Sequence, residues 1–287
     1  MENRNIPVVL NLCDDFSAGY AGEKQLNEMI ENLYRYAPFP VEITGIRIGA
    51  ETCGFLFSRM TVAQWKAVSR MAGEILKRDG LSVTLTVPVV EQSAWKAAKK
   101  LLEDALQQPW IHSMAVNDFG ALKVAAGQTE ESLCCGKKIV LGRYFDKRFR
   151  DPRVSDEDMT TEESAVCSDA WNLLIRQYGI CGVELECMKQ NPGFYDTDLD
   201  VSVHFPYSLV SSGQICEFSG IGNPEKGHFE IGHCREQCRG IIGTAFHKSL
   251  KKPLIKSENA LYMKNSAEML DPVLLKSPGF SLIYTEL

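Results

Sequence analysis

Three cysteines lie within 23 residues in the last third of the chain, at Cys216, Cys234 and Cys238. Seventeen residues separate Cys216 from Cys234, three separate Cys234 from Cys238, and the longer interval contains glycines and a proline. Thiolates are soft ligands that select zinc, copper(I) or iron-sulfur clusters, and a glycine-rich loop lets several sulfurs reach one ion or cluster. The pattern therefore indicates a metal site whose fourth ligand comes from elsewhere in the chain.

The alternative for any cysteine is a buried thiol that packs as a small apolar group. We assign this role to the six cysteines outside the ligand set, which are Cys13, Cys134, Cys135, Cys167, Cys181 and Cys187. His228 and His233 lie inside the cysteine-rich segment, and either could replace a cysteine as a zinc ligand or be a hydrogen-bonded neighbour. Spacing alone does not choose between zinc and an iron-sulfur cluster, because both are held by four thiolates.

Three further titratable residues lie on expected strands. Glu184 and Glu186 alternate with apolar residues, and two carboxylates on an interior face are costly unless they are paired or hydrated. His204 shares one face of its strand with two serines. Inside a barrel, these three residues could act as acid-base groups or bind a substrate. The alternative for His204 is a polar residue packed against an outer helix.

Two other pairs end expected strands. Asn117 and Asp118 are interpreted as the N-cap of the helix that follows them. Arg143 and Tyr144 could meet an anionic substrate, although the surrounding sequence GRYFDKRFRDPR is basic enough to be a solvated loop.

The composition is that of a globular protein. A chain of 287 residues with 45% hydrophobic content can bury a full core. The formal net charge of −6 and the lack of a long basic run argue against duplex nucleic acid as the main partner. The amino end lacks a signal-peptide pattern, and no apolar stretch is long enough to span a membrane. We therefore expect a cytoplasmic protein, whose cysteines are better explained by metal binding and buried thiols than by disulfides.

Apolar periodicity predicts strands that alternate with helices. The expected strands are residues 8–12, 41–49, 81–89, 111–118, 137–145, 182–187 and 201–209. The expected helices are residues 22–36, 61–80, 92–108, 119–126 and 161–179, with Thr61 as an N-cap and Gly80 as a stop signal. This α/β pattern predicts a (β/α) barrel related to the TIM barrel, with a doubly wound sheet as the second choice.

The barrel is expected to form a single domain over residues 1–287. A cysteine-rich loop at 210–240 follows the seventh strand, and a segment at 241–287 closes the barrel or packs over it. In such barrels the chemistry lies at the carboxyl ends of the strands. The second strand ends in GAETCG, which places Cys53 at that face together with the cysteine-rich loop. Cys53 therefore supplies the fourth ligand.

Several motifs together carry a family resemblance. They are IRIGAETC in an early strand, AVNDFGALKVA in mid-chain, the H-x-P strand VHFPYSL and the three late cysteines. On these motifs most of the chain resembles the collagenase-like peptidase family U-thirty-two, although only the cysteine pattern is specific. Within the family it is most similar to the UbiV-like iron-sulfur subunit, the smaller partner in anaerobic ubiquinone hydroxylation. There, one early and three late cysteines ligate a [4Fe-4S] cluster, which implies the same role here for Cys53, Cys216, Cys234 and Cys238.

The chain departs from the family where it reads SSGQIC in place of Ser-x-Arg-Cys, and in the insert MKQNPGFYDTDLD. The resemblance implies oxygen-independent hydroxylation of a quinone precursor or an RNA base, with a related subunit as heterodimer partner. A cluster with four cysteine ligands has no open iron, so electron transfer or structural support is expected of it. One alternative is a U-thirty-two peptidase or peptide-binding protein with a structural four-cysteine zinc site, although G-x-S-x-G and H-E-x-x-H motifs are absent. Another is a non-catalytic iron-sulfur interaction subunit.

Overall fold

The fold is built on a closed barrel of eight parallel strands. The computed structural model describes residues 4–287 except 128–135, 147, 149–150, 155–163, 196, 214–217, 219–233 and 235. Around the barrel the strand order is β1-β12-β7-β6-β5-β4-β3-β2. The strands are β1 (Ile6–Asn11), β2 (Val41–Gly49), β3 (Ser82–Val87), β4 (Ser113–Val116), β5 (Lys138–Leu141), β6 (Ile180–Glu186), β7 (Asp200–Phe205) and β12 (Phe280–Tyr284). The predicted (β/α) barrel is therefore confirmed.

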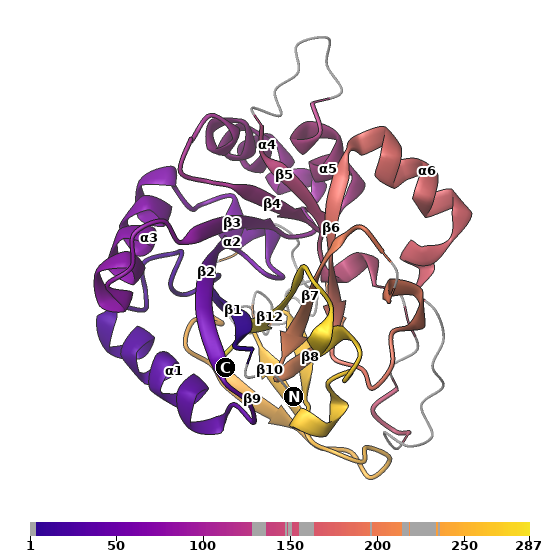
Figure 1. Cartoon of the computed structure of the whole chain (residues 1–287). Coiled ribbons are helices and arrows are strands. Elements are labelled where there is room, and N and C mark those ends of the chain that lie inside the picture. Colours follow the sequence, from indigo (N-terminus) through magenta and orange to yellow (C-terminus); the bar gives the residue numbers. More distant parts are fainter. Residues whose placement is uncertain are drawn as a thin grey trace.

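Helices cover the outer face of the barrel, as Figure 1 shows for α1, α3, α4 and α5. The described helices are α1 (Glu23–Tyr36), α2 (Gly54–Phe57), α3 (Val62–Leu76), α4 (Gln92–Leu106), α5 (Phe119–Ala125) and α6 (Asp169–Tyr178). Their apolar stripes pack on the strands, since α1 buries Leu26, Met29 and Leu33. None of the helices in the described part of the chain is long and apolar enough to cross a membrane.

The ends of the helices follow local side-chain chemistry. Thr61 is the N-cap of α3, and its hydroxyl oxygen accepts a hydrogen bond from the Gln64 backbone N–H at 3.2 Å, as predicted. The predicted stop at Gly80 is wrong, because the helix ends at Lys77, which adopts a left-handed conformation with φ of 50°. The predicted helix at 161–179 is shorter, since the described helix begins at Asp169.

The predicted strand at 201–209 is two strands in two sheets. Pro206 separates β7 from β8 (Tyr207–Ser212), and proline cannot donate a hydrogen bond to a strand ladder. β8 belongs to a second, antiparallel sheet of order β8-β11-β10-β9. Its other strands are β9 (Ile242–Ala245), β10 (Leu254–Ser257) and β11 (Ala260–Lys264).

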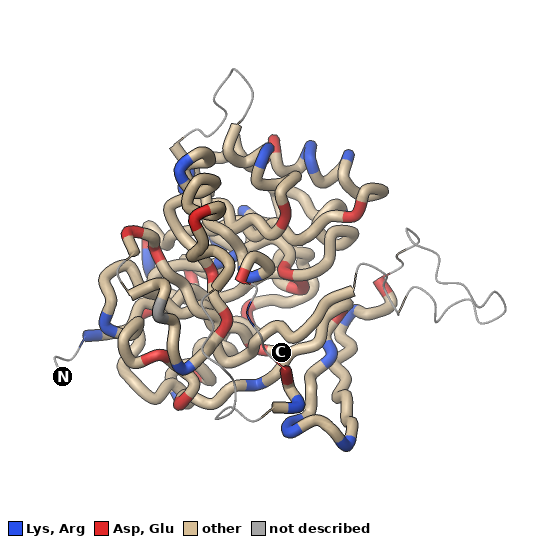
Figure 2. Tube along the Cα trace, turned by 90° about the vertical axis from the view of Figure 1, so that its right-hand side faces the viewer, with Lys and Arg blue, Asp and Glu red and all other residues tan. Residues whose placement is uncertain are grey.

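The carboxyl-terminal segment both closes the barrel and packs beside it. β12 pairs in parallel with β1 and with β7, which confirms that FSLIY closes the barrel. The residues PVLLK form no strand and contain a short 3-10 helix, Leu274–Lys276. Basic and acidic residues are interspersed along the trace, so the view in Figure 2 has no single basic face.

Candidate functional site

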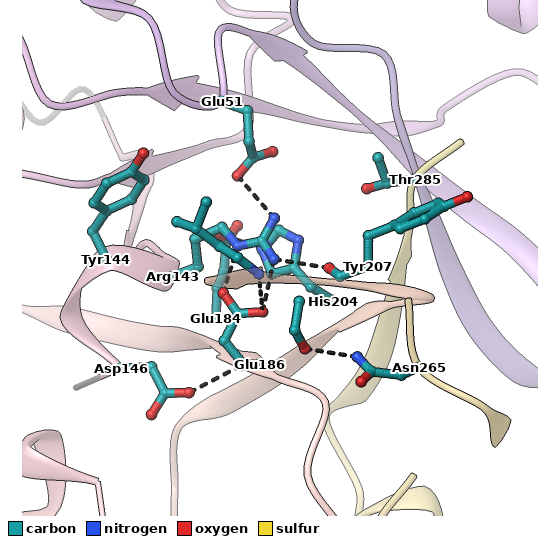
Figure 3. A network of polar contacts seen from close by, with 12 residues as sticks. Glu51, Arg143, Tyr144, Asp146, Glu184, Glu186, His204, Tyr207, Asn265 and Thr285 are labelled. Carbon is teal, nitrogen blue, oxygen red and sulfur yellow. Dashed lines mark hydrogen bonds and ion pairs between the residues drawn. The ribbon is translucent and has the colours of Figure 1, made fainter. Parts of the chain in front are cut away.

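A layer of charged side chains fills the carboxyl end of the barrel (Figure 3). Arg47 on β2 and Arg143 after β5 are each 1% exposed, and Glu51, Glu184 and Glu186 are 2%, 3% and 0% exposed. Buried charges of this kind persist only when they are paired and hydrogen-bonded. Five such residues in one layer therefore form a single electrostatic unit.

Arg47 joins two of these carboxylates. Its Nη2 donates to Glu184 Oε2 and its Nη1 donates to Glu51 Oε2, each at 2.9 Å. Asn11, at the end of β1, also donates through Nδ2 to Glu51 Oε2 at 2.9 Å. Arg47 and Glu51 were not among the candidate residues. The available signal was a lone arginine among the apolar residues of VEITGIRIG, because a charge in a doubly buried strand needs an interior partner.

Arg143 makes a two-pronged ion pair with Glu186. Its Nε and Nη2 lie 2.7 Å from Glu186 Oε1 and Oε2. The second sheet contacts the same pair, since Nη2 donates to the Tyr207 carbonyl at 2.9 Å and the Leu209 N–H donates to Glu186 at 3.1 Å. The interpretation of Arg143 as part of a solvated loop is wrong. The pair ties the barrel to the second sheet, and its hydrogen-bond geometry gives Glu186 a structural role whether or not it acts in catalysis.

His204 lies in the barrel interior, where it contacts Glu184. It is fully buried, and its Nε2 is 3.3 Å from Glu184 Oε2. The alternative position against an outer helix is therefore wrong. Burial raises the pKa of the Glu184 carboxyl to about 7, although the charge of Arg47 opposes the shift. A carboxyl whose pKa lies near neutral pH, in contact with an imidazole, can hold or exchange a proton.

The raised pKa of Glu184 predicts a pH-dependent stability. The pKa of Glu184 is about 7 in the folded protein and 4.5 ordinarily, so the folded protein binds this proton more tightly than the unfolded chain does. The resulting stabilisation is complete below pH 4.5 and is lost as the pH rises through 7. From pH 5 to pH 8 the loss is roughly 2–3 kcal/mol, since each pKa unit corresponds to about 1.4 kcal/mol.

Glu184→Gln mimics the protonated carboxyl, so its free energy of unfolding should not show this loss between pH 5 and pH 8. Urea unfolding at the two pH values measures the difference. Burial also raises the pKa of Glu258 to about 7. Because Glu258 is present in both proteins, the difference between them isolates Glu184. An equal loss of stability in the two proteins would contradict the assignment.

The residues at the ends of β4 and β5 have structural contacts. Asp118 is the N-cap of α5, where its Oδ1 accepts from the Ala121 N–H at 2.6 Å, which confirms the cap. Asn117 links neighbouring loops, donating to the Val87 carbonyl at 3.0 Å and accepting from the Tyr144 N–H at 3.2 Å. Neither arrangement requires a substrate.

Cys53 lies at the same end of the barrel, directly after β2. It is half-buried and caps α2, where its sulfur accepts from the Leu56 N–H at 3.4 Å. Burial raises the pKa of its thiol, and the nearby Glu258 and Cys234 add to the shift. Two of the four proposed ligands, Cys53 and Cys234, are therefore close enough to interact electrostatically.

The turn that carries Cys234 and Cys238 is held against the barrel by side chains. Arg59 donates to the Cys234 carbonyl at 2.6 Å and to Glu236 Oε1 at 3.1 Å. Tyr20 also hydrogen-bonds Glu236. The Cys234 sulfur itself accepts from the Glu236 N–H at 3.4 Å. This clamp orients the turn toward the loop of Cys53.

Cys238 lies beside a second group of titratable residues. It lines a cavity of about 540 Å³ together with Cys13, Asp14 and Glu258. Burial raises the pKa of Asp14 well above its usual value, and the carboxylate of Glu258 raises it further. The rim of the proposed metal site is therefore acidic.

The remaining cysteine and histidine candidates divide into two groups. Cys13 and Cys187 are buried, as predicted, and Cys167 and Cys181 are half-buried. The candidates that lie outside the described residues are Cys216, Cys134, Cys135, His228 and His233. Among the residues that the structure describes, no three His, Cys, Asp or Glu side chains are arranged to hold a metal ion.

Comparisons with known proteins give the fold only distant neighbours. No family model and no curated protein matches the sequence. The wild-type HPPK-DHPS structure of Plasmodium falciparum is similar with a TM-score of 0.36 and 10% identity, over 71% of this chain and 37% of that chain. Two triple mutants of that protein give TM-scores of 0.35 and 0.33 with 10% and 13% identity. This chain therefore spans well under half of the length of these neighbours.

Proposed function

We propose that the protein is a [4Fe-4S] iron-sulfur protein that acts in oxygen-independent hydroxylation of a quinone precursor or an RNA base, with a related subunit as partner. The observation that supports it is that Cys53, from an early loop at the carboxyl end of the barrel, is close enough to Cys234, from a late loop, for the two thiols to interact electrostatically. This juxtaposition agrees with the family resemblance of the cysteine pattern. The carboxyl end of the barrel is also the face on which barrel enzymes carry out their chemistry.

The proposed donors are thiols, the ligand type that holds an iron-sulfur cluster, but the three that the structure describes do not by themselves form a metal-binding group. Cys53, Cys234 and Cys238 are half-buried and belong to two segments joined by Arg59. Burial keeps the Cys53 thiol protonated, and a bound cation would reverse this, because a coordinating thiol loses its proton. Cys216 would complete the set. When bound, a cluster with four cysteine ligands supplies one-electron transfer.

The chain's own residues supply a proton site and a fixed electrostatic frame. Glu184, in contact with His204, can hold a proton near neutral pH. Arg47 orients Glu184 through its hydrogen bond, and the neighbouring pair of Arg143 and Glu186 keeps the layer rigid. In this proposal the interior layer stores the proton, and the residues at the mouth bind the partners of the reaction.

Anaerobic co-expression with a related family subunit tests the hydroxylation. The expected result is that the two subunits co-purify and that the substrate gains the mass of one oxygen atom without molecular oxygen. The control is the same preparation with Glu184→Gln, in which product formation should fall while the subunits still co-purify. Cleavage of a peptide by a colourless, zinc-containing protein would favour the peptidase alternative instead.

A further inference from the structure

A separate cavity lies between the barrel mouth and the second sheet. Its volume is about 360 Å³, within the range of small-ligand pockets. The loops after β2, β3 and β5 provide Thr52, Glu91 and Tyr144, and the second sheet and its β10–β11 turn provide Leu209 and Asn259. The cavity is thus lined by both parts of the fold.

Asn259 presents a buried acceptor to this cavity. The residue is 8% exposed, and its Nδ2 donates to the Gly213 carbonyl at 2.7 Å and to the Thr52 carbonyl at 3.1 Å. These two bonds fix the orientation of the amide, because only the nitrogen can donate to carbonyl oxygens. The remaining atom, Oδ1, has no hydrogen-bond partner within the described part of the chain.

Glu91 presents a second buried acceptor, a carboxyl group whose pKa burial raises. The residue is 9% exposed, and its Oε2 likewise has no partner among the described residues. The backbone makes room for this carboxylate, since a Cβ on Gly54 would lie 2.5 Å from Oε2. A Cβ would also lie 2.8 Å from the Val89 carbonyl oxygen, so glycine is needed for both the carboxylate and the backbone of the loop after β3.

The other charges that line the cavity are already neutralised. Arg143 is paired with Glu186, and Asp146 accepts from Arg148 through both carboxylate oxygens at 2.7 Å. Glu91 is therefore the one charged group of the described lining that has no ion-pair partner among the described residues. A buried carboxylate oxygen (Glu91 Oε2) and a buried amide oxygen (Asn259 Oδ1) that lack donors are costly, and a ligand that supplies N–H groups removes this cost.

We propose that this cavity binds an organic cation with an amidinium or guanidinium group, whose N–H donors reach Glu91 and Asn259. A planar group with several N–H donors matches two separate acceptors, and its positive charge matches the carboxylate. Glu91, which lines the cavity, lies against Gly54, the neighbour of Cys53. A role of the cavity as a substrate subsite rests on the proposed function, whereas its binding of an organic cation does not.

Benzamidinium chloride and sodium benzoate are suitable probes, because they have the same ring and opposite hydrogen-bonding and charge properties. Binding to the full chain is measured by calorimetry and by ligand-observed NMR. We expect benzamidinium to bind saturably and benzoate not to bind. Glu91→Gln should weaken benzamidinium binding at least about tenfold, as expected for a charge-assisted hydrogen bond. Glu103→Gln, an exposed carboxylate on the same helix, is the matched control and should bind as the wild type does.

Gly54→Ala provides a second variant, since its Cβ should displace both the Glu91 carboxylate and the Val89–Val90 backbone that carries it, and so weaken binding while leaving Glu91 in the sequence. Circular dichroism establishes that each variant is folded. Absence of saturable benzamidinium binding to the wild type, or equal binding by Glu91→Gln, would overturn the proposal. Iron content measured on the same samples separates this proposal from the iron-sulfur proposal. If the protein binds benzamidinium but contains no iron, the cavity proposal stands and only the cluster proposal fails.

Discussion

Replacing Cys234 by alanine is expected to lower the iron bound by anaerobically purified protein from about four atoms per chain to background, as a cubane cluster needs its ligands. Cys234 is half-buried and its backbone carbonyl is held by Arg59. The substitution keeps that backbone contact and removes only the sulfur. Iron and labile sulfide analysis, with circular dichroism to show that the variant is folded, measures the effect.

Cys167→Ala is the matched control for this result. Cys167 is also half-buried, but it lies outside the proposed ligand set. Its replacement should leave iron loading unchanged. If both variants load iron equally, or both lose it equally, the assignment of Cys234 as a ligand is wrong.

Replacing Arg143 by methionine is expected to lower the free energy of unfolding by roughly 3–5 kcal/mol, the cost of leaving one partner of a buried ion pair without the other. Glu186 would retain the Leu209 N–H, but it would lose both guanidinium hydrogen bonds in a fully buried position. The second sheet would also lose its contact at the Tyr207 carbonyl. Urea unfolding at constant pH measures the change.

Two comparisons make this prediction specific. Arg70→Met removes an arginine that is 78% exposed and pairs with Glu74 on the same helix, so its effect should stay below about 0.5 kcal/mol. The double variant Arg143→Met with Glu186→Leu removes both buried charges and should recover much of the lost stability. An additive loss in the double variant would show that the pair is not the source of the effect.

The strand and helix pattern was predictable because it follows local rules. Apolar runs such as VEITGIRIG are typical of strands buried on both faces, and amphipathic segments such as Glu23–Tyr36 form the covering helices. Gly49, the last residue of β2, has φ of +100°, and a Cβ there would lie 2.2 Å from the Thr86 carbonyl oxygen. The sequence therefore specifies where the loop of Cys53 begins.

The second sheet and the charge layer were not predictable in the same way. β8 continues the alternation of β7, so periodicity alone could not show that the chain changes sheet after Pro206. Arg47 and Glu51 are four residues apart in sequence, but their other ion-pair partners lie far along the chain, Glu184 for Arg47 and Arg143 for Glu51. Interactions between distant segments depend on the closure of the barrel, which local patterns do not encode.

The most direct test of the iron-sulfur proposal is the iron, zinc and labile sulfide content of the wild-type full chain purified under nitrogen. We expect about four irons and four sulfides per chain, with a brown colour and broad absorption near ~400 nm. A colourless protein with one zinc and no sulfide would contradict the proposal.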